Sequence, residues 1–214
     1  MKKRIIALFC AVALFPVLCF SVSAKTSYPK QTDRFFVNDY ASVLSAEAEN
    51  QMYEQGKKLY YACKAQVVAV TVNSLDGEEI EDYAYNLARS WKLGDKEKDN
   101  GILLLLSLTE RKVRIEVGSG LEGALPDSKT GRILDTYGVD YFKNDEFEDG
   151  ILSVYNSLIN EVYIEYGLEP DADYEPVEDD DGSIWPALII FALIILFNIW
   201  SAKKGGGRIR FFPI

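Results

Sequence analysis

The polar residues best placed for chemistry are three aspartates and an asparagine that stand beside apolar segments. Asp39 follows one short apolar stretch, Asp99 and Asn100 precede another, and Asp127 ends a glycine-rich stretch. Each has an ordinary structural explanation as a turn or helix-capping residue. Together they offer carboxylate and amide oxygens, which are the hard donors that Ca²⁺ prefers. We therefore expect Asp39, Asp99, Asn100 and Asp127 to converge on one divalent cation, with Ca²⁺ as the cofactor.

The glycine-rich stretch, GSGLEGALPD at residues 118–127, runs from the end of an expected strand to the start of an expected helix. It lacks the lysine of a phosphate-binding P-loop and the glycine spacing of a dinucleotide-binding fold. Ligands of open α/β sheets bind beyond the carboxyl ends of the parallel strands. We therefore expect this loop to border the ligand crevice.

The chain contains no histidine. Catalysis by Ser-His-Asp or Cys-His groups is therefore excluded, and so are the usual histidine-containing zinc sites. Carboxylates, amides and hydroxyls remain as the functional groups, together with a hard metal ion if a metal is used.

The negative charge is concentrated in the central part of the chain. All 33 acidic residues lie within residues 25–183, whereas seven of the 23 basic residues lie outside that segment. Sixteen bases remain there, which gives the segment a net charge of −17. Such a field repels phosphate backbones and anionic lipid and favours cations, so no nucleic acid is expected as a partner.

Helical and strand periodicities alternate through residues 33–168 and predict one folded domain. Helices are expected at 45–63, 80–91, 126–137 and 145–166, and strands at 66–71, 102–106 and 112–117. The last helix begins with an apparent capping box formed by Asp145 and Glu148.

The order of these elements predicts the fold class. A strand, a crossover helix and a second strand indicate a parallel pair, to which the strand at 112–117 adds an antiparallel edge. The expected fold is therefore α/β: a three-layer α/β/α sandwich with a small mixed sheet.

The N-terminus has the parts of a secretory signal peptide over residues 1–24. Three basic residues precede an apolar run, and Ala24 ends a stretch of small residues. Cleavage after Ala24 leaves Cys63 as the single cysteine, so no intramolecular disulfide is expected.

A second apolar segment, residues 184–202, is uncharged and long enough to cross a bilayer as one helix. Trp185 and Trp200 flank it, and a short basic tail, residues 203–214, follows. The positive-inside rule places this tail in the cytoplasm and the acidic domain outside. We expect a single-pass anchor in the cell membrane.

Residues 169–183, EPDADYEPVEDDDGS, contain eight acids, two prolines and no base. Such a composition favours a disordered, self-repelling linker between the domain and the membrane anchor.

Several motifs, in order, resemble the TPM domain family over about residues 35–165. They are VNDYA at 37–41, QVVAVTV at 66–72, IEDYA at 80–84, WKLG at 91–94, DNGILL at 99–104 and the glycine-rich stretch at 118–127. The last is similar to the family's signature, Gly-x-Gly-Leu-Glu-x-x-Leu-Pro-Asp. Many bacterial members continue in a long Gly/Ser-rich tail, whereas this sequence has only GGG at 205–207 and seven further residues.

The resemblance implies an α/β/α domain that is secreted or membrane-tethered. The family includes a thylakoid-lumen member linked to photosystem II repair and credited with acid phosphatase activity, and some bacterial members are associated with Ca²⁺. Three functions follow as hypotheses. The first is a membrane-tethered module that binds a divalent cation and acts in envelope protein quality control or assembly.

The second hypothesis is a metal-assisted acid phosphatase of low activity, in which Asp99 or Asp127 would act as base or nucleophile. The third is a metal-free domain that binds a protein partner through an exposed patch of Tyr137, Tyr141 and Phe142.

Overall fold

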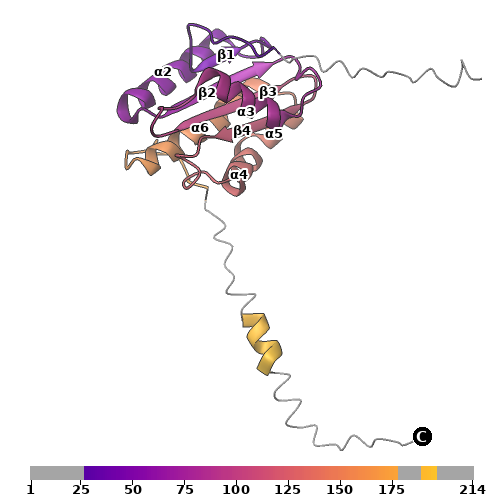
Figure 1. Ribbon diagram of the computed structural model, residues 1–214, viewed down its shortest axis with the longest axis vertical. Coiled ribbons are helices and arrows are strands. Elements are labelled where there is room, and N and C mark those ends of the chain that lie inside the picture. Colours follow the sequence, from indigo (N-terminus) through magenta and orange to yellow (C-terminus); the bar gives the residue numbers. More distant parts are fainter. Residues whose placement is uncertain (1–26, 178–188, 197–214) are drawn as a thin grey trace, which may run out of the picture.

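A computed structural model of the chain describes residues 27–177 and 189–196. Its sheet has four strands in the order β1-β2-β3-β4: β1 (Val37–Asp39), β2 (Gln66–Val72), β3 (Gly101–Ser107) and β4 (Lys112–Val117). The first three strands are parallel, and β4 is antiparallel to β3 (Figure 1). The mixed sheet is as predicted, but the short strand β1 escaped the sequence analysis.

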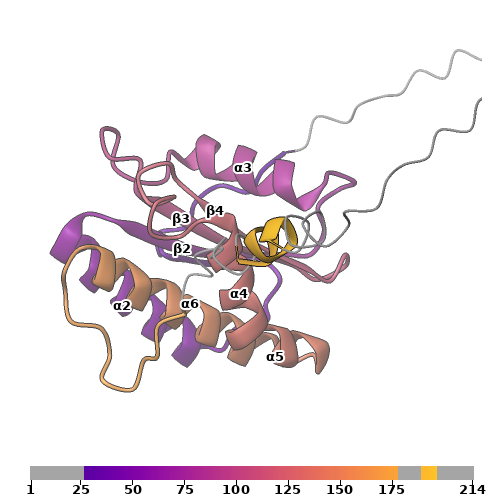
Figure 2. The same cartoon turned by 90° about the horizontal axis from the view of Figure 1, so that it is seen from below.

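Helices cover both faces of this sheet (Figure 2). Helix α3 (Ile80–Trp91) packs on one face, against β3 and β4. The other face carries α2 (Ala46–Cys63) and α6 (Phe147–Glu165), with α4 (Asp127–Tyr137) and the short α5 (Val139–Lys143) beside α6. The described residues thus form the expected α/β arrangement.

The exposure of each strand follows from its residue pattern. All seven residues of β3 are buried, as a continuous apolar strand between two helical layers requires. In β4 the small hydrophobic residues alternate with charged ones, and Ile115 is the fully buried member. Arg114 and Glu116 therefore point to the same face of this edge strand.

Helix α2 begins and ends where its sequence dictates. The Ser45 hydroxyl accepts a hydrogen bond from the Ala48 amide at 3.2 Å, which satisfies a free donor of the first turn. At the other end Lys64 adopts a left-handed conformation with φ of 67°, and its amide bonds to the Tyr60 carbonyl.

The predicted capping box of the last helix is wrong. Asp145 lies outside the helix with φ of 63° and pairs with Arg111. Glu148 instead accepts hydrogen bonds from the backbone amide and the hydroxyl of Ser45, the residue that caps α2. Glu148 thus connects the N-terminus of α6 to the N-terminus of α2 instead of capping its own helix.

The expected aromatic patch does not form either. Phe142 packs against the core, directly over Gly150. Tyr137 stacks on Tyr174 with 6.0 Å between ring centroids, which leaves Tyr141 as the exposed member.

The predicted disordered linker is ordered in its first half. Residues 169–177, which we call the C-terminal strap, return along α6 and bond to Asn160 and Glu161. The Glu161 carboxylate accepts from the Tyr174 hydroxyl at 2.7 Å and from the Val177 amide at 3.2 Å. The amide of Asp171 donates to the side-chain oxygen of Asn160 at 2.8 Å.

Four predicted segments fall wholly or partly outside the described residues. The signal peptide (1–24), the second half of the linker (178–183) and the basic tail (203–214) lie outside them entirely. Of the predicted membrane span, residues 189–196 are described and are helical. Among the helices of 27–177 and 189–196, none has both the length and the apolar character that a bilayer crossing needs.

Removing the C-terminal strap should destabilise the domain. A chain that ends at Leu168 lacks both strap donors to the buried Glu161, so we expect its free energy of unfolding to fall by about 2 kcal/mol. Urea denaturation followed by circular dichroism measures the difference against a chain that ends at Val177. Equal midpoints for the two chains would show that the strap adds nothing to stability.

Candidate functional site

The structure separates Asp39 from the other predicted ligands. Sheet register aligns Asp39 with Thr71 and Thr71 with Leu106, at the carboxyl ends of the parallel strands. Asn100 precedes the first residue of β3, six positions before Leu106. At the rise of an extended strand this is a separation of roughly 20 Å. Asp39 therefore cannot share a cation with Asn100.

The oxygens of Asp39 already have partners within the chain. They accept hydrogen bonds from the Leu44 amide at 2.8 Å, from the Val43 amide at 3.2 Å and from the Thr71 hydroxyl. Asp39 thus fixes the turn between β1 and α2, which is the ordinary structural role.

Asp99 and Asn100 also serve the fold. One oxygen of Asp99 accepts from the amide and the hydroxyl of Ser119, at 3.1 and 2.8 Å. The fully buried Asn100 accepts from the Asp95 amide at 2.9 Å and donates to the Tyr166 hydroxyl at 2.7 Å. Within the described ranges there is no group of three or more Cys, Asp or Glu side chains arranged to hold a metal ion.

The loop 118–127 lies at the edge of the sheet opposite to the predicted one. Because β4 is antiparallel, its last residue, Val117, pairs with Ile102 at the start of β3. The loop therefore borders the amino ends of the parallel strands. Ligands of open α/β sheets bind beyond the carboxyl ends of the parallel strands, whereas a loop that follows an antiparallel edge strand lies at the opposite end of the sheet.

Most residues of this loop have structural tasks. A side chain at Gly118 or Gly120 would collide with the backbone before β3: its Cβ would lie 2.2 Å from the Asp99 carbonyl oxygen or 1.7 Å from that of Lys98. The Gly120 amide donates to the Asp99 carbonyl at 3.0 Å. Leu121 and Leu125 are buried in the core and thereby fix the loop to the domain.

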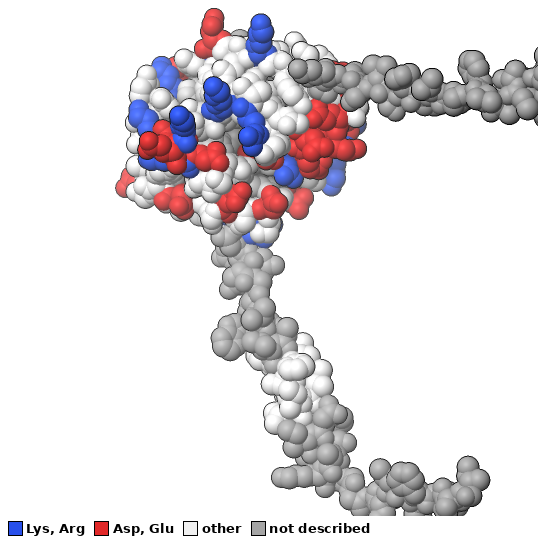
Figure 3. Space-filling model, in the orientation of Figure 1, with Lys and Arg blue, Asp and Glu red and all other residues white. Residues whose placement is uncertain are grey.

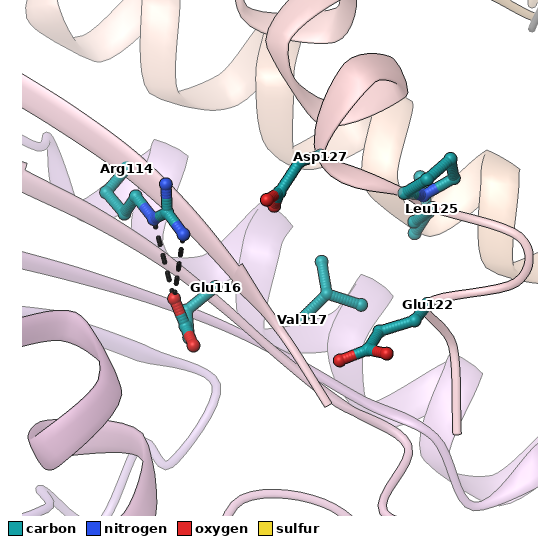
Figure 4. Close-up of a pocket in the computed structure, with 7 residues that line it drawn as sticks. Arg114, Glu116, Val117, Glu122, Leu125 and Asp127 are labelled. Carbon is teal, nitrogen blue, oxygen red and sulfur yellow. Dashed lines mark hydrogen bonds and ion pairs between the residues drawn. The ribbon is translucent and has the colours of Figure 1, made fainter. Parts of the chain in front are cut away.

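The side chains of two residues, Glu122 and Asp127, make no such contacts, although Asp127 stands in the first turn of α4, where its negative charge is favourable to the helix. Both are exposed, and neither carboxylate makes a hydrogen bond or ion pair with another residue in the part of the chain that the structure describes. They border a hollow of about 420 Å³. Its lining is formed by Arg114, Glu116, Val117, Glu122, Leu125, Pro126 and Asp127 (Figure 4).

The hollow has an excess of negative charge. Arg114 pairs with Glu116 at 3.3 Å (Figure 4), which leaves Glu122 and Asp127 uncompensated on either side of Val117. Burial raises the pKa of Glu116, Arg114 opposes the rise, and the charges of Asp127 and Glu122 add to it. The hollow therefore favours a ligand that brings positive charge.

Of the four predicted site residues, Asp127 alone borders this hollow. Glu116 and Glu122, which also line it, are not among the predicted residues. The signal for Glu116 was available, because the alternation along β4 places Arg114 and Glu116 on one face. Glu122 could be found only by asking which residues of the loop the fold leaves unused.

Substituting Gly120 by alanine should strongly destabilise the protein. The added Cβ would lie 1.7 Å from a backbone oxygen, so one of the two loops must move. We expect a loss of about 3 kcal/mol in the free energy of unfolding, measured by urea denaturation. Gly123→Ala is the matched control, since its Cβ would meet nothing within 4 Å. A loss of equal size in both variants would contradict the close approach.

Solved structures of three bacterial proteins are similar to this chain. The N-terminal domain of a protein from P. gingivalis is 29% identical, with a TM-score of 0.58, over 63% of this chain and 85% of that one. The N-terminal domain of a Corynebacterium glutamicum protein is 13% identical, with a TM-score of 0.48, and the match covers 72% of this chain and 94% of that one.

The BA42 protein of the psychrophilic bacterium Bizionia argentinensis is also 13% identical, with a TM-score of 0.49, and the match covers 63% of this chain and 90% of that one. The comparison with curated proteins gives no match. The family model of the TPM domain matches residues 37–161, which is more than half of the chain and contains all residues that line the hollow. The chain therefore belongs to the TPM domain family.

Proposed function

We propose that this protein is a membrane-tethered, extracytoplasmic TPM domain that binds a divalent cation, Ca²⁺, in the hollow of Glu116, Glu122 and Asp127. One observation carries the cation-binding part. In the loop that resembles the family signature, two of the glycines and both leucines have structural roles. Glu122 and Asp127 instead border one hollow and have no partner among the described residues. Unpartnered carboxylates that converge on a hollow are candidates for binding a ligand.

The donor chemistry of the hollow fits such an ion. Its acceptor groups are carboxylates, and Ca²⁺ is bound by six to eight oxygens, several of which water can supply. Among the described residues these three carboxylates are not arranged as a ready ligand group, so a cation would have to draw them together. Glu122 is exposed, which leaves its side chain room to turn toward Asp127. Arg114 neutralises part of the charge of Glu116, which makes the hollow suited to one divalent ion.

We also propose where the domain is located and what it does there. The apolar segment 184–202 would hold the domain at the outer face of the cell membrane, and its basic tail would remain inside. There the domain would act in the quality control or assembly of envelope proteins, with cation occupancy governing its surface charge. An unidentified protein partner belongs to this proposal.

The geometry favours this function over the two alternatives. A phosphate in the hollow would meet Arg114 already paired with Glu116, and it would face two further carboxylates. A phosphatase at this place would therefore repel its substrate unless a bound cation neutralised the carboxylates, and Arg114 would still be occupied by Glu116. The aromatic patch of the interaction hypothesis does not exist as such, because Phe142 packs against the core.

Calcium titration of the chain ending at Val177 tests the site. The double variant Glu122→Gln/Asp127→Asn should bind Ca²⁺ at least tenfold more weakly by calorimetry, because it removes both uncompensated carboxylates. The wild type should gain about 2.7 kcal/mol of stability at a Ca²⁺ concentration of 100 times the dissociation constant.

The matched control removes two exposed carboxylates elsewhere, Asp135→Asn/Asp140→Asn, where Asp135 lies further along α4 and Asp140 on α5. This control should bind Ca²⁺ as the wild type does. If the two double variants respond to Ca²⁺ alike, the hollow is not the site.

The pH dependence of binding follows from Glu116. Because its pKa is raised, chiefly by burial, the carboxyl still carries a proton at pH values where a free glutamate is ionised. Ca²⁺ must displace that proton, so the affinity should fall as the pH falls through this pKa, by up to about tenfold per pH unit.

Calorimetry over a series of pH values measures this slope. In Glu116→Gln the affinity should be weaker at neutral pH and should decline only at the lower pH where the remaining carboxyls take up protons. In the absence of cation, the folded state holds the Glu116 proton more tightly than the unfolded state does. The contribution of Glu116 to the free energy of unfolding therefore decreases as the pH rises through its raised pKa. A wild-type affinity that is flat across this range would contradict the role of Glu116.

A further inference from the structure

Lysine and tyrosine side chains from three elements gather at the amino edge of the sheet. The ammonium of Lys64 lies 4.7 Å from the ring centroid of Tyr60 and 5.7 Å from that of Tyr61. Lys58 lies over Tyr163 at 5.8 Å, and Lys98 over Tyr166 at 5.9 Å. We call these residues the lysine–tyrosine patch: Lys58, Lys64 and Lys98 with Tyr60, Tyr61, Tyr163 and Tyr166.

The members of the patch are contiguous in space. Lys58 extends from α2 to a ring on α6, and Lys98 extends from the loop before β3 to the end of α6. Between them lies Cys63. Burial raises the pKa of its thiol and the Lys98 ammonium opposes that shift, as a neighbouring cation does.

The three lysines have no acidic partner in the part of the chain that the structure describes. Acids outnumber bases 33 to 16 over residues 25–183, yet none of these lysines takes part in an ion pair between described residues, as is also true of several other lysines of the chain. All three are exposed, and the tyrosine rings hold them in place through cation–π contacts. Their charge is available to an external anion.

Figure 3 shows the face of the molecule that carries α3, where acidic side chains cluster on the right and both signs are mixed on the left. The patch belongs to the other side of the sheet, which α2 and α6 cover. Tyr61, with 69% of its surface exposed, adds an aromatic ring to the patch. Tyrosine and lysine together are typical of surfaces that lie in the headgroup region of a membrane, with the ring in the interface and the ammonium at the phosphates.

We propose that the lysine–tyrosine patch docks the domain on the anionic lipid headgroups of the membrane that holds its predicted anchor. This inference goes beyond cation binding. Of the proposed function it needs only the membrane anchor at residues 184–202 and not the Ca²⁺ site. Charge complementarity supplies the attraction. The overall negative charge opposes it weakly, because at physiological salt the Debye length is about 8 Å and distant charges are screened.

The length of the chain allows such docking. The described domain ends at Val177, which bonds to Glu161 on α6, and Tyr163 lies on the opposite side of the same helix. Tyr163, the patch residue on α6, and the exit point are thus roughly one helix diameter, about 10 Å, apart. Residues 178–183 span at most roughly 20 Å before the predicted anchor begins at residue 184, so this end of the patch lies within reach of the headgroups.

Hydroxyl-radical footprinting of the mature full-length chain in vesicles tests this proposal. On vesicles containing phosphatidylglycerol, oxidation of Tyr61 should fall severalfold relative to neutral phosphatidylcholine vesicles, and 1 M salt should restore it. Tyr85 on α3, which is 48% exposed, is the internal control and should react equally in both. Lys58→Gln/Lys64→Gln/Lys98→Gln should abolish the protection.

The matched control with the same loss of charge, Lys30→Gln/Lys112→Gln/Lys143→Gln, should keep the protection of Tyr61. Equal oxidation of Tyr61 on both kinds of vesicle overturns the proposal. Protection by soluble polyglutamate but not by anionic vesicles also overturns it and assigns the patch to an acidic protein.

The outcome for the anchor is separable from the outcome for docking. If alkaline carbonate extracts the chain from the vesicles, residues 184–202 do not anchor it in the membrane. The proposal that the patch docks on the lipids of that membrane then fails as well. A chain that resists extraction but leaves Tyr61 unprotected contradicts docking alone. The Ca²⁺ response of the hollow is measured independently of both.

Discussion

The close approach of two backbones at the amino edge of the sheet is the constraint on which the functional end of this domain depends. The loop 118–120 lies directly against Lys98 and Asp99, and no side chain fits between them. The Asp99 carboxylate binds Ser119, and the adjacent Asn100 is buried between the Asp95 amide and the Tyr166 hydroxyl. These contacts fix the start of β3, the end of β4 and the end of α6 relative to one another.

The polar groups that suggested a metal site are thus the groups that build this edge. Asp99 and Asn100 were selected because they offer oxygens in a loop, and those oxygens are used for hydrogen bonds within the chain. The same holds for Asp39 at the opposite edge. A hard donor in a loop indicates a site only when the fold leaves it without a partner, as it leaves Glu122 and Asp127.

The sequence predicted the fold better than the site. Periodicity located α2, α3 and the strands β2–β4, because apolar spacing reflects burial directly. It missed β1, whose three residues are too few to show a period, and the C-terminal strap, whose acidic composition is typical of disorder. The strap is ordered because the buried Glu161, already paired with Lys129 at 2.8 Å, accepts two of its donors. No local pattern contains that information.

The hollow and the lysine–tyrosine patch lie at the same edge and share one segment of backbone. Lys98 contributes its ammonium to the patch, while its carbonyl lies beneath Gly120 in the loop that carries Glu122. The two proposed surfaces therefore meet at one short segment of backbone. Because no side chain fits between Lys98 and Gly120, a displacement of Lys98 on docking would have to move the loop that carries Glu122 as well.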